Sequence, residues 1–73
     1  MKRHAVDSSL LRSVGYDAEL CVLEIELAPG RVYRYYQVPA RVHRHLLEAP
    51  SPGAYFNREI RSTYPYEEIT RRR

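Results

Sequence analysis

Two tyrosines around an arginine come nearest to a recognisable binding chemistry in this sequence. Tyr33 and Tyr35 are two positions apart in a run of strand-forming residues, and Arg34 lies between them. Residues two apart in a strand share one face, and aromatic rings on an exposed sheet face stack on unpaired bases. The pattern therefore predicts a stacking platform for RNA or another single-stranded nucleic acid, provided that this face is exposed.

The arginines of the second half of the chain extend this prediction to phosphate binding. Residues 31–61 hold six arginines and two glutamates, within a chain of net charge +3. Arginine binds phosphate through a planar fork of N–H donors, so we expect a nucleic-acid-binding module. The residues of this hypothesis are Tyr33, Tyr35, Arg34, Arg41, Arg44, Arg58 and Arg61.

Two alternative roles are compatible with the same arginines. In the first, the basic face or an exposed sheet edge binds another protein, without nucleic acid. In the second, the arginines keep a small domain soluble and pair with its own carboxylates. The sequence leaves these alternatives and the oligomeric state open.

Catalytic and metal chemistry have less support. His43 and His45 are two residues apart, which on a helix turns them about 200° from each other and keeps them from sharing one metal ion. With the single Cys21 we expect neither a metal nor a cofactor, and we expect His45 on the apolar helix side to be partly buried. A nuclease that uses His43, Tyr55 and Arg58 is the enzymatic alternative. Nothing in the sequence brings these three together, so we expect no enzyme.

Three segments of the first half are predicted to form an antiparallel meander. Residues 10–16 favour a short strand, and residues 19–27 alternate apolar and polar side chains with the period of a half-buried strand. Residues 28–31 contain Pro-Gly, which favours a turn, and the β-rich run 32–38 follows.

The length of the turn decides whether the tyrosines are exposed. With an even loop, Leu27 lies opposite Val32, and Tyr33 and Tyr35 point to the face away from the core. With an odd, bulged loop, Leu27 lies opposite Tyr33, and both tyrosines join Ile25 on the core face. The sequence is compatible with both registers.

Two short helices are predicted after the meander. Pro39 suits a first helical position, and apolar residues recur at helical spacing up to Ala49 while Arg41 and Arg44 point away. Ser51 is placed to cap a second helix, which should end near residues 61–63. The expected fold class is α+β, a small three-stranded antiparallel meander followed by two short helices, in the order βββαα.

Within the second helix, Phe56 and Ile60 have the spacing of a buried side. Asn57 follows Phe56 near that side. We expect its amide to hydrogen-bond the preceding loop or hairpin, because buried amides need partners.

Size and composition limit the remaining choices. The 73 residues make one domain, 1–73, with the segments 1–5 and 70–73 expected to be frayed tails. A lone cysteine forms no internal disulfide, which fits a reducing compartment, and no apolar run is long enough to span a membrane. We therefore expect a cytoplasmic protein with no membrane contact.

Several short motifs recur together in one order along the chain. They are Ser8-Ser9, Gly15-Tyr16-Asp17, Leu23 to Leu27, Gly30, Tyr33-Arg34-Tyr35, Val38-Pro39, Ser51, Gly53, Tyr55-Phe56-Asn57, Ile60 and Tyr64. Their order and spacing resembles the KTSC domain, a small bacterial and phage module that is also an appendage of some lysyl-tRNA synthetases. This chain resembles the stand-alone form.

The resemblance implies little chemistry. The family has no established function, and RNA binding has been suggested from the synthetase context alone. The chain has no synthetase catalytic region, so the resemblance does not imply that it charges tRNA. The structural or motif residues implied are Tyr16, Pro39, Phe56, Asn57 and Ile60.

Overall fold

The chain folds into one five-stranded sheet and two helical segments. The computed structural model describes residues 3–6, 8–28 and 30–69. The fold is α+β, as expected, but the described sheet has five strands, so the expectation of three is wrong. In chain order the elements are β1 (Arg3–Ala5), β2 (Leu11–Asp17), β3 (Val22–Leu27), β4 (Arg31–Tyr35), α1 (Ala40–Glu48), α2 (Pro52–Tyr55), its π-helical continuation η1 (Phe56–Ile60), and β5 (Tyr66–Glu68).

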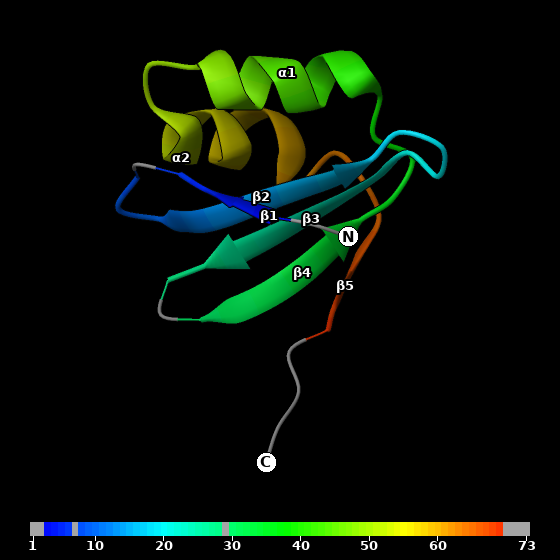
Figure 1. The fold of residues 1–73 in the computed structure, drawn as a ribbon, viewed down its shortest axis with the longest axis horizontal. Coiled ribbons are helices and arrows are strands. Elements are labelled where there is room, and N and C mark those ends of the chain that lie inside the picture. Colours follow the sequence, from blue (N-terminus) through cyan, green and yellow to red (C-terminus); the bar gives the residue numbers. More distant parts are fainter. Residues whose placement is uncertain (1–2, 7, 29, 70–73) are drawn as a thin grey trace.

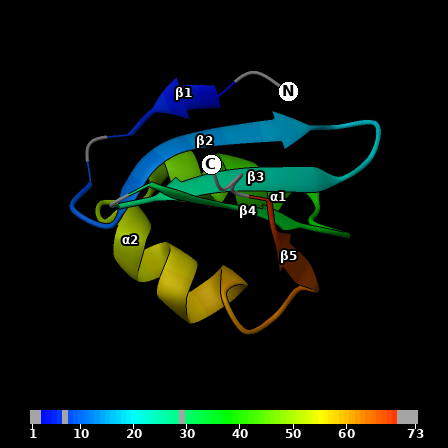
Figure 2. The same cartoon turned by 90° about the horizontal axis from the view of Figure 1, so that it is seen from below.

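The sheet is antiparallel throughout, and its strand order is β1-β2-β3-β4-β5. Both helical segments lie on one side of it (Figure 1), and Figure 2 shows β1 along the outer side of β2. The edge strands β1 and β5 have three residues each, too few to show an alternating pattern in the sequence. β1 falls within the segment expected to be frayed, and the expected tail at 70–73 lies outside the described residues.

The turn between β3 and β4 is odd in length, and this turns the tyrosines toward the helices. Leu27 pairs with Arg31 and Ile25 with Tyr33, so residues 28–30 separate the strands. The register differs from both expected pairings of Leu27, but it has the parity of the bulged alternative. Gly30 has a φ of +146°, a conformation that side chains rarely adopt, which accounts for glycine here.

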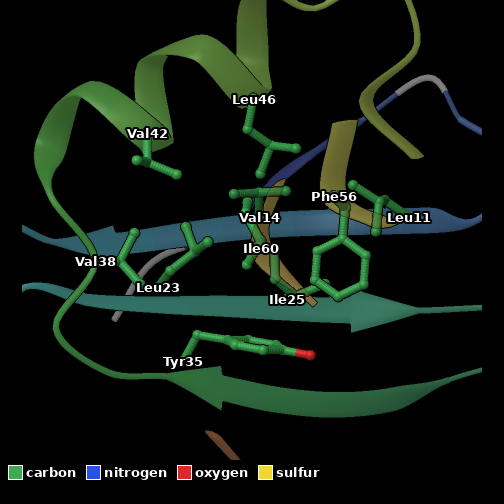
Figure 3. Close-up of a cluster of buried hydrophobic side chains, with 10 residues drawn as sticks. All are labelled: Leu11, Val14, Leu23, Ile25, Tyr35, Val38, Val42, Leu46, Phe56 and Ile60. Carbon is green, nitrogen blue, oxygen red and sulfur yellow. The ribbon is translucent and has the colours of Figure 1, made fainter. Parts of the chain in front are cut away.

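The core lies between the sheet and the helices (Figure 3). Phe56 and Ile60 are fully buried, which confirms their expected orientation, and Phe56 is the largest of the fully buried side chains. Tyr35 is 3% exposed and is the one core tyrosine. The buried cluster consists of Leu11, Val14, Leu23, Ile25, Tyr35, Val38, Val42, Leu46, Phe56 and Ile60.

The ends of the helices follow the sequence signals closely. Pro39 is the N-cap residue of α1, one position before the expected one, and the Ser51 hydroxyl accepts a hydrogen bond from Ala54 N (3.3 Å) as the predicted cap of α2. In η1 the Arg61 N–H donates to Phe56 O (2.9 Å) over five residues. Among the described residues, no helix is long and apolar enough to cross a membrane.

Candidate nucleic-acid interface

The predicted tyrosine platform is not available for base stacking. Tyr35 lies in the core, where its ring stacks on Tyr66 at 5.1 Å and meets Phe56 edge-on at 5.5 Å. Burial raises the pKa of its hydroxyl to about 12. Tyr33 is half-buried with its ring 5.7 Å from Tyr66. The register puts both rings on the helix side, so the exposed face that the stacking prediction required is not present for this pair.

Arg34 points to the opposite, helix-free side of the sheet. Its Nε donates to Glu24 Oε1 at 3.0 Å, and this bond raises the pKa of Arg34. Arg3 Nε lies 3.3 Å from Glu24 Oε2. The register places Arg3, Gly15, Glu24 and Arg34 side by side across four strands, so the missing side chain of Gly15 lets Arg3 reach Glu24. Glu24 is only 6% exposed.

The other carboxylates of this helix-free face also have partners. Ser13 Oγ donates to Glu26 at 2.8 Å, and the Tyr36 hydroxyl donates to Glu67. With Glu24, three glutamates thus stand on the face that carries Arg3 and Arg34. Such a face offers little to a phosphate backbone, so Arg34 is separated from the other arginines of the hypothesis.

The remaining four arginines lie on the helical layer. Arg41 and Arg44 are exposed on α1 and make no hydrogen bond or ion pair with the described part of the chain. Arg58 is exposed on η1, pairs with Glu59 at 2.9 Å and lies 5.7 Å above the Tyr55 ring. Arg61 follows η1 and is also exposed. All four arginines are exposed on or directly after the helical segments, and we refer to Arg41, Arg44, Arg58 and Arg61 together as the basic helical surface.

Tyr16 joins the sheet to the start of α1. Its hydroxyl donates to Val38 O at 2.6 Å, and its ring stacks on His43 at 4.8 Å. This fixes the link that leads into Pro39. His43 is half-buried and His45 exposed, so the expected burial of His45 is wrong. The inward side of α1 centres on Val42 and Leu46 and leaves His43 on the flank that faces Tyr16.

Asn57 has a different role from the expected one. It is exposed, and its Oδ1 accepts a hydrogen bond from Arg61 Nη1 at 3.1 Å, one helical turn away. The expected bond to the preceding loop or hairpin is therefore replaced by one along the helix. Phe56 takes the buried direction, which turns the neighbouring Asn57 outward.

A cavity of about 530 Å³ lies between the β1–β2 connection and the α1–α2 connection. Its described lining is uncharged and consists mainly of polar or small residues, a feature that was not predicted from the sequence. The serines at 8, 9 and 51 were the available signal. The lining residues are Ser8, Ser9, Leu10, Pro50, Ser51, Pro52, Gly53, Ala54 and Asn57.

The described residues give metal and nuclease chemistry no support. Within ranges 3–6, 8–28 and 30–69, no three His, Cys, Asp or Glu side chains are grouped to hold a metal ion. His43 stacks on Tyr16, whereas Arg58 lies over Tyr55. The absence of a metal and of enzymatic activity both stay predictions.

His43 gives the domain a testable pH dependence. Burial, and then the charge of His4, lower the pKa of His43. Below pH 6.5 the unfolded chain therefore takes up a proton that the folded state binds only at lower pH, so stability falls as the solution is acidified. His43→Phe keeps a ring on Tyr16 but has no group that titrates in this range. We expect urea unfolding to show that its free energy of unfolding falls less between pH 7.5 and 5.5 than that of the wild type. Equal losses would exclude His43 as the source.

Architecture places this chain among small α+β domains in which two helical segments cover one face of an antiparallel sheet. Residues 7–64 match the KTSC domain, and the chain belongs to this family. It is similar to a crystal structure of a KTSC domain protein from Yersinia pestis, with a TM-score of 0.89 and 34% identity over 94% of this chain and 97% of that one.

Two relatives show the contexts of such domains. An uncharacterised protein of Stutzerimonas stutzeri is 54% identical over 57 residues, which are 78% of this chain and 80% of that protein. A lysine–tRNA ligase of Nostoc punctiforme is 33% identical over 64 residues, which are 88% of this chain but 11% of the ligase. The chain thus corresponds to a small part of the ligase.

Proposed function

We propose that this domain is a non-enzymatic module that binds single-stranded RNA in the cytoplasm through its basic helical surface. The observation that carries the proposal is the state of Arg41 and Arg44, which are exposed and have no partner in the described chain. Arg58 and Arg61 lie on the same layer of the domain. Unpaired, exposed guanidinium groups can neutralise phosphates without first breaking an internal ion pair.

The distribution of charge between the two sides of the domain supports this choice. The glutamates of the helix-free face are held by Arg3, Arg34, Ser13 and Tyr36. On the helical layer four exposed arginines accompany two exposed glutamates, Glu48 and Glu59, whereas the helix-free face has three glutamates beside Arg3 and Arg34. The helical layer is therefore the more favourable side for a polyanion. The similarity to part of a lysine–tRNA ligase agrees with an RNA ligand, since that ligase acts on tRNA.

The proposed binding is dominated by phosphate contacts. The buried Tyr35 removes the stacking pair, and Tyr55 is half-buried beneath Arg58. For a single strand, each neutralised phosphate contributes a slope of roughly −0.7 to the plot of log K against log salt concentration. Four arginines therefore give a slope of about −3 at most. Binding should be strongly salt-dependent and weakly sequence-selective.

Fluorescence anisotropy with a labelled single-stranded RNA tests this proposal. We expect the double variant Arg41→Gln/Arg44→Gln to bind about 10-fold more weakly at low salt, with a salt slope reduced by roughly 1.4. The double variant Arg12→Gln/Arg31→Gln has the same net charge, and its Arg31 is already close to Glu68 (3.9 Å). Its RNA affinity should fall less than about 3-fold, since this variant changes only the net charge of the domain.

Equal losses in the two double variants would show that net charge alone drives binding and would overturn the assignment to α1. If the wild type does not bind RNA at low salt, a protein-binding module becomes the better assignment. An acidic partner on the helical layer, or a strand added to the edge of β1 or β5, would then be the function to test.

A further inference from the structure

The serine-lined cavity offers mainly hydrogen-bond donors. Ser8 Oγ accepts from Leu10 N (3.2 Å) and Leu11 N (3.3 Å), which occupies both of its lone pairs. Ser8 can therefore interact with a ligand only by donating its hydroxyl proton. Ser51 Oγ accepts from Ala54 N, so it keeps its proton and one lone pair. A bound group with several acceptors would match this arrangement.

Asn57 adds to the same preference. Its Oδ1 is occupied by Arg61 Nη1, which orients the amide and leaves the two N–H donors of Nδ2. Asn57 therefore presents donors to the cavity that it lines.

The described lining of the cavity is uncharged, whereas Arg58 and Arg61 make the bordering helix basic. Among the residues that the structure describes, none of those that line the cavity carries a charge, so they give a phosphate no ionic partner inside. Arg58 and Arg61 lie next to Asn57 and one turn beyond it. A nucleotide matches this arrangement. Its sugar and base are neutral and rich in hydrogen-bond acceptors, and its phosphates are charged.

Gly53 keeps the cavity in its present form. A Cβ at this position would lie 3.1 Å from both Leu10 Cβ and Ser8 Oγ, so a larger residue would require these neighbours to shift. Leu10 and Pro52 add apolar surface to the lining. At about 530 Å³ the cavity is within the common range for small-molecule sites.

We propose that this cavity holds the sugar and base of one unpaired ribonucleotide, with its phosphates on Arg58 and Arg61. The proposal rests on the proposed RNA binding and adds a pocket that receives one nucleoside. Donors from Ser8, Ser51 and Asn57 bind sugar and base acceptors, and Leu10 and the prolines contact the apolar surface of the ring.

Uncharged ribonucleosides are the direct probe, because they bind without help from the arginines. In amide NMR spectra of the full chain, titration with adenosine, cytidine, guanosine or uridine should selectively shift the amide signals of residues 8–10, 51 and 53–57, since Pro52 has no N–H. We expect a dissociation constant on the order of 1 mM for the best nucleoside, as befits a ligand without its phosphates. No shift up to about 10 mM, or shifts centred elsewhere, would overturn the proposal.

Two variants make the assignment specific. Ser9 is exposed and lines the cavity, so Ser9→Trp should fill it and weaken nucleoside binding at least 10-fold. Ala18→Trp adds the same ring at the exposed β2–β3 turn and should change nothing. Asn57→Asp keeps an acceptor for Arg61 but removes the amide donors, so it should weaken binding several-fold. An unchanged affinity in Ser9→Trp would exclude this cavity.

The RNA assay separates failure of this inference from failure of the proposed function. If Ser9→Trp binds single-stranded RNA as tightly as Ala18→Trp while Arg41→Gln/Arg44→Gln does not, the surface is right and the cavity proposal is wrong. If nucleosides shift the cavity residues but the wild type does not bind RNA, the proposed function is wrong and the cavity is a nucleoside site.

Discussion

Tyr35→Ala is expected to unfold the domain, whereas Tyr35→Phe should leave it folded. Tyr35 is 3% exposed and contacts the rings of Phe56 and Tyr66. Truncation of a buried aromatic residue costs about 3–5 kcal/mol, which is comparable to the whole net stability of a domain of this size. Phenylalanine keeps the ring and removes the hydroxyl. Circular dichroism during thermal and urea unfolding measures the stability of both variants.

The same pair of variants separates a core role from a base-stacking role. A Tyr35→Ala protein that stays folded, within about 1 kcal/mol of the wild type, and loses RNA affinity would restore the stacking interpretation. We expect instead that Tyr35→Phe binds RNA like the wild type, since its ring contacts protein.

Glu24→Gln is expected to give the second largest loss, about 1–3 kcal/mol in the free energy of unfolding. Glu24 is 6% exposed and receives Arg3 at 3.3 Å and Arg34 at 3.0 Å. The variant leaves both guanidinium groups without a charged partner. Their side chains are 30% and 42% exposed, so water compensates in part and keeps the loss below that of a fully buried pair.

Glu59→Gln is the matched control for this prediction. It breaks the exposed pair with Arg58, and surface substitutions of this kind change stability by no more than about 0.5 kcal/mol. Glu24→Gln should also speed hydrogen exchange in β1, because Arg3 ties that edge strand to β3. Equal stability of the two variants would contradict the role given to Glu24.

β3 and α1 could be predicted from the sequence because each has a regular pattern over six or more residues. Alternating apolar and polar residues indicated β3, helical spacing of apolar residues indicated α1, and Ser51 indicated the start of α2. β1 and β5 could not be found in this way, since three residues give no measurable period and their pairing depends on neighbours distant in the chain. Arg3 pairs with Gly15, and Tyr66 with Tyr35.

The candidate site was harder to predict, because the length of the β3–β4 turn, odd or even, decides which side chains of β4 share a face. Moving the register by one residue would exchange Arg34 with its two flanking tyrosines. Residue type alone therefore grouped Arg34 with the helical arginines, although it lies beside Glu24. The cavity combines Ser8 and Ser51 from two connections 43 residues apart, and neither connection has a periodic pattern.

Mapping the RNA-binding surface by amide NMR tests the central claim most directly. On addition of an unlabelled single-stranded RNA at low salt, we expect shifts in α1, η1 and the cavity residues, and little change at Glu24, Arg34 and Tyr36. Shifts concentrated on the helix-free face, or none at all with a protein that is folded, would contradict binding through the basic helical surface.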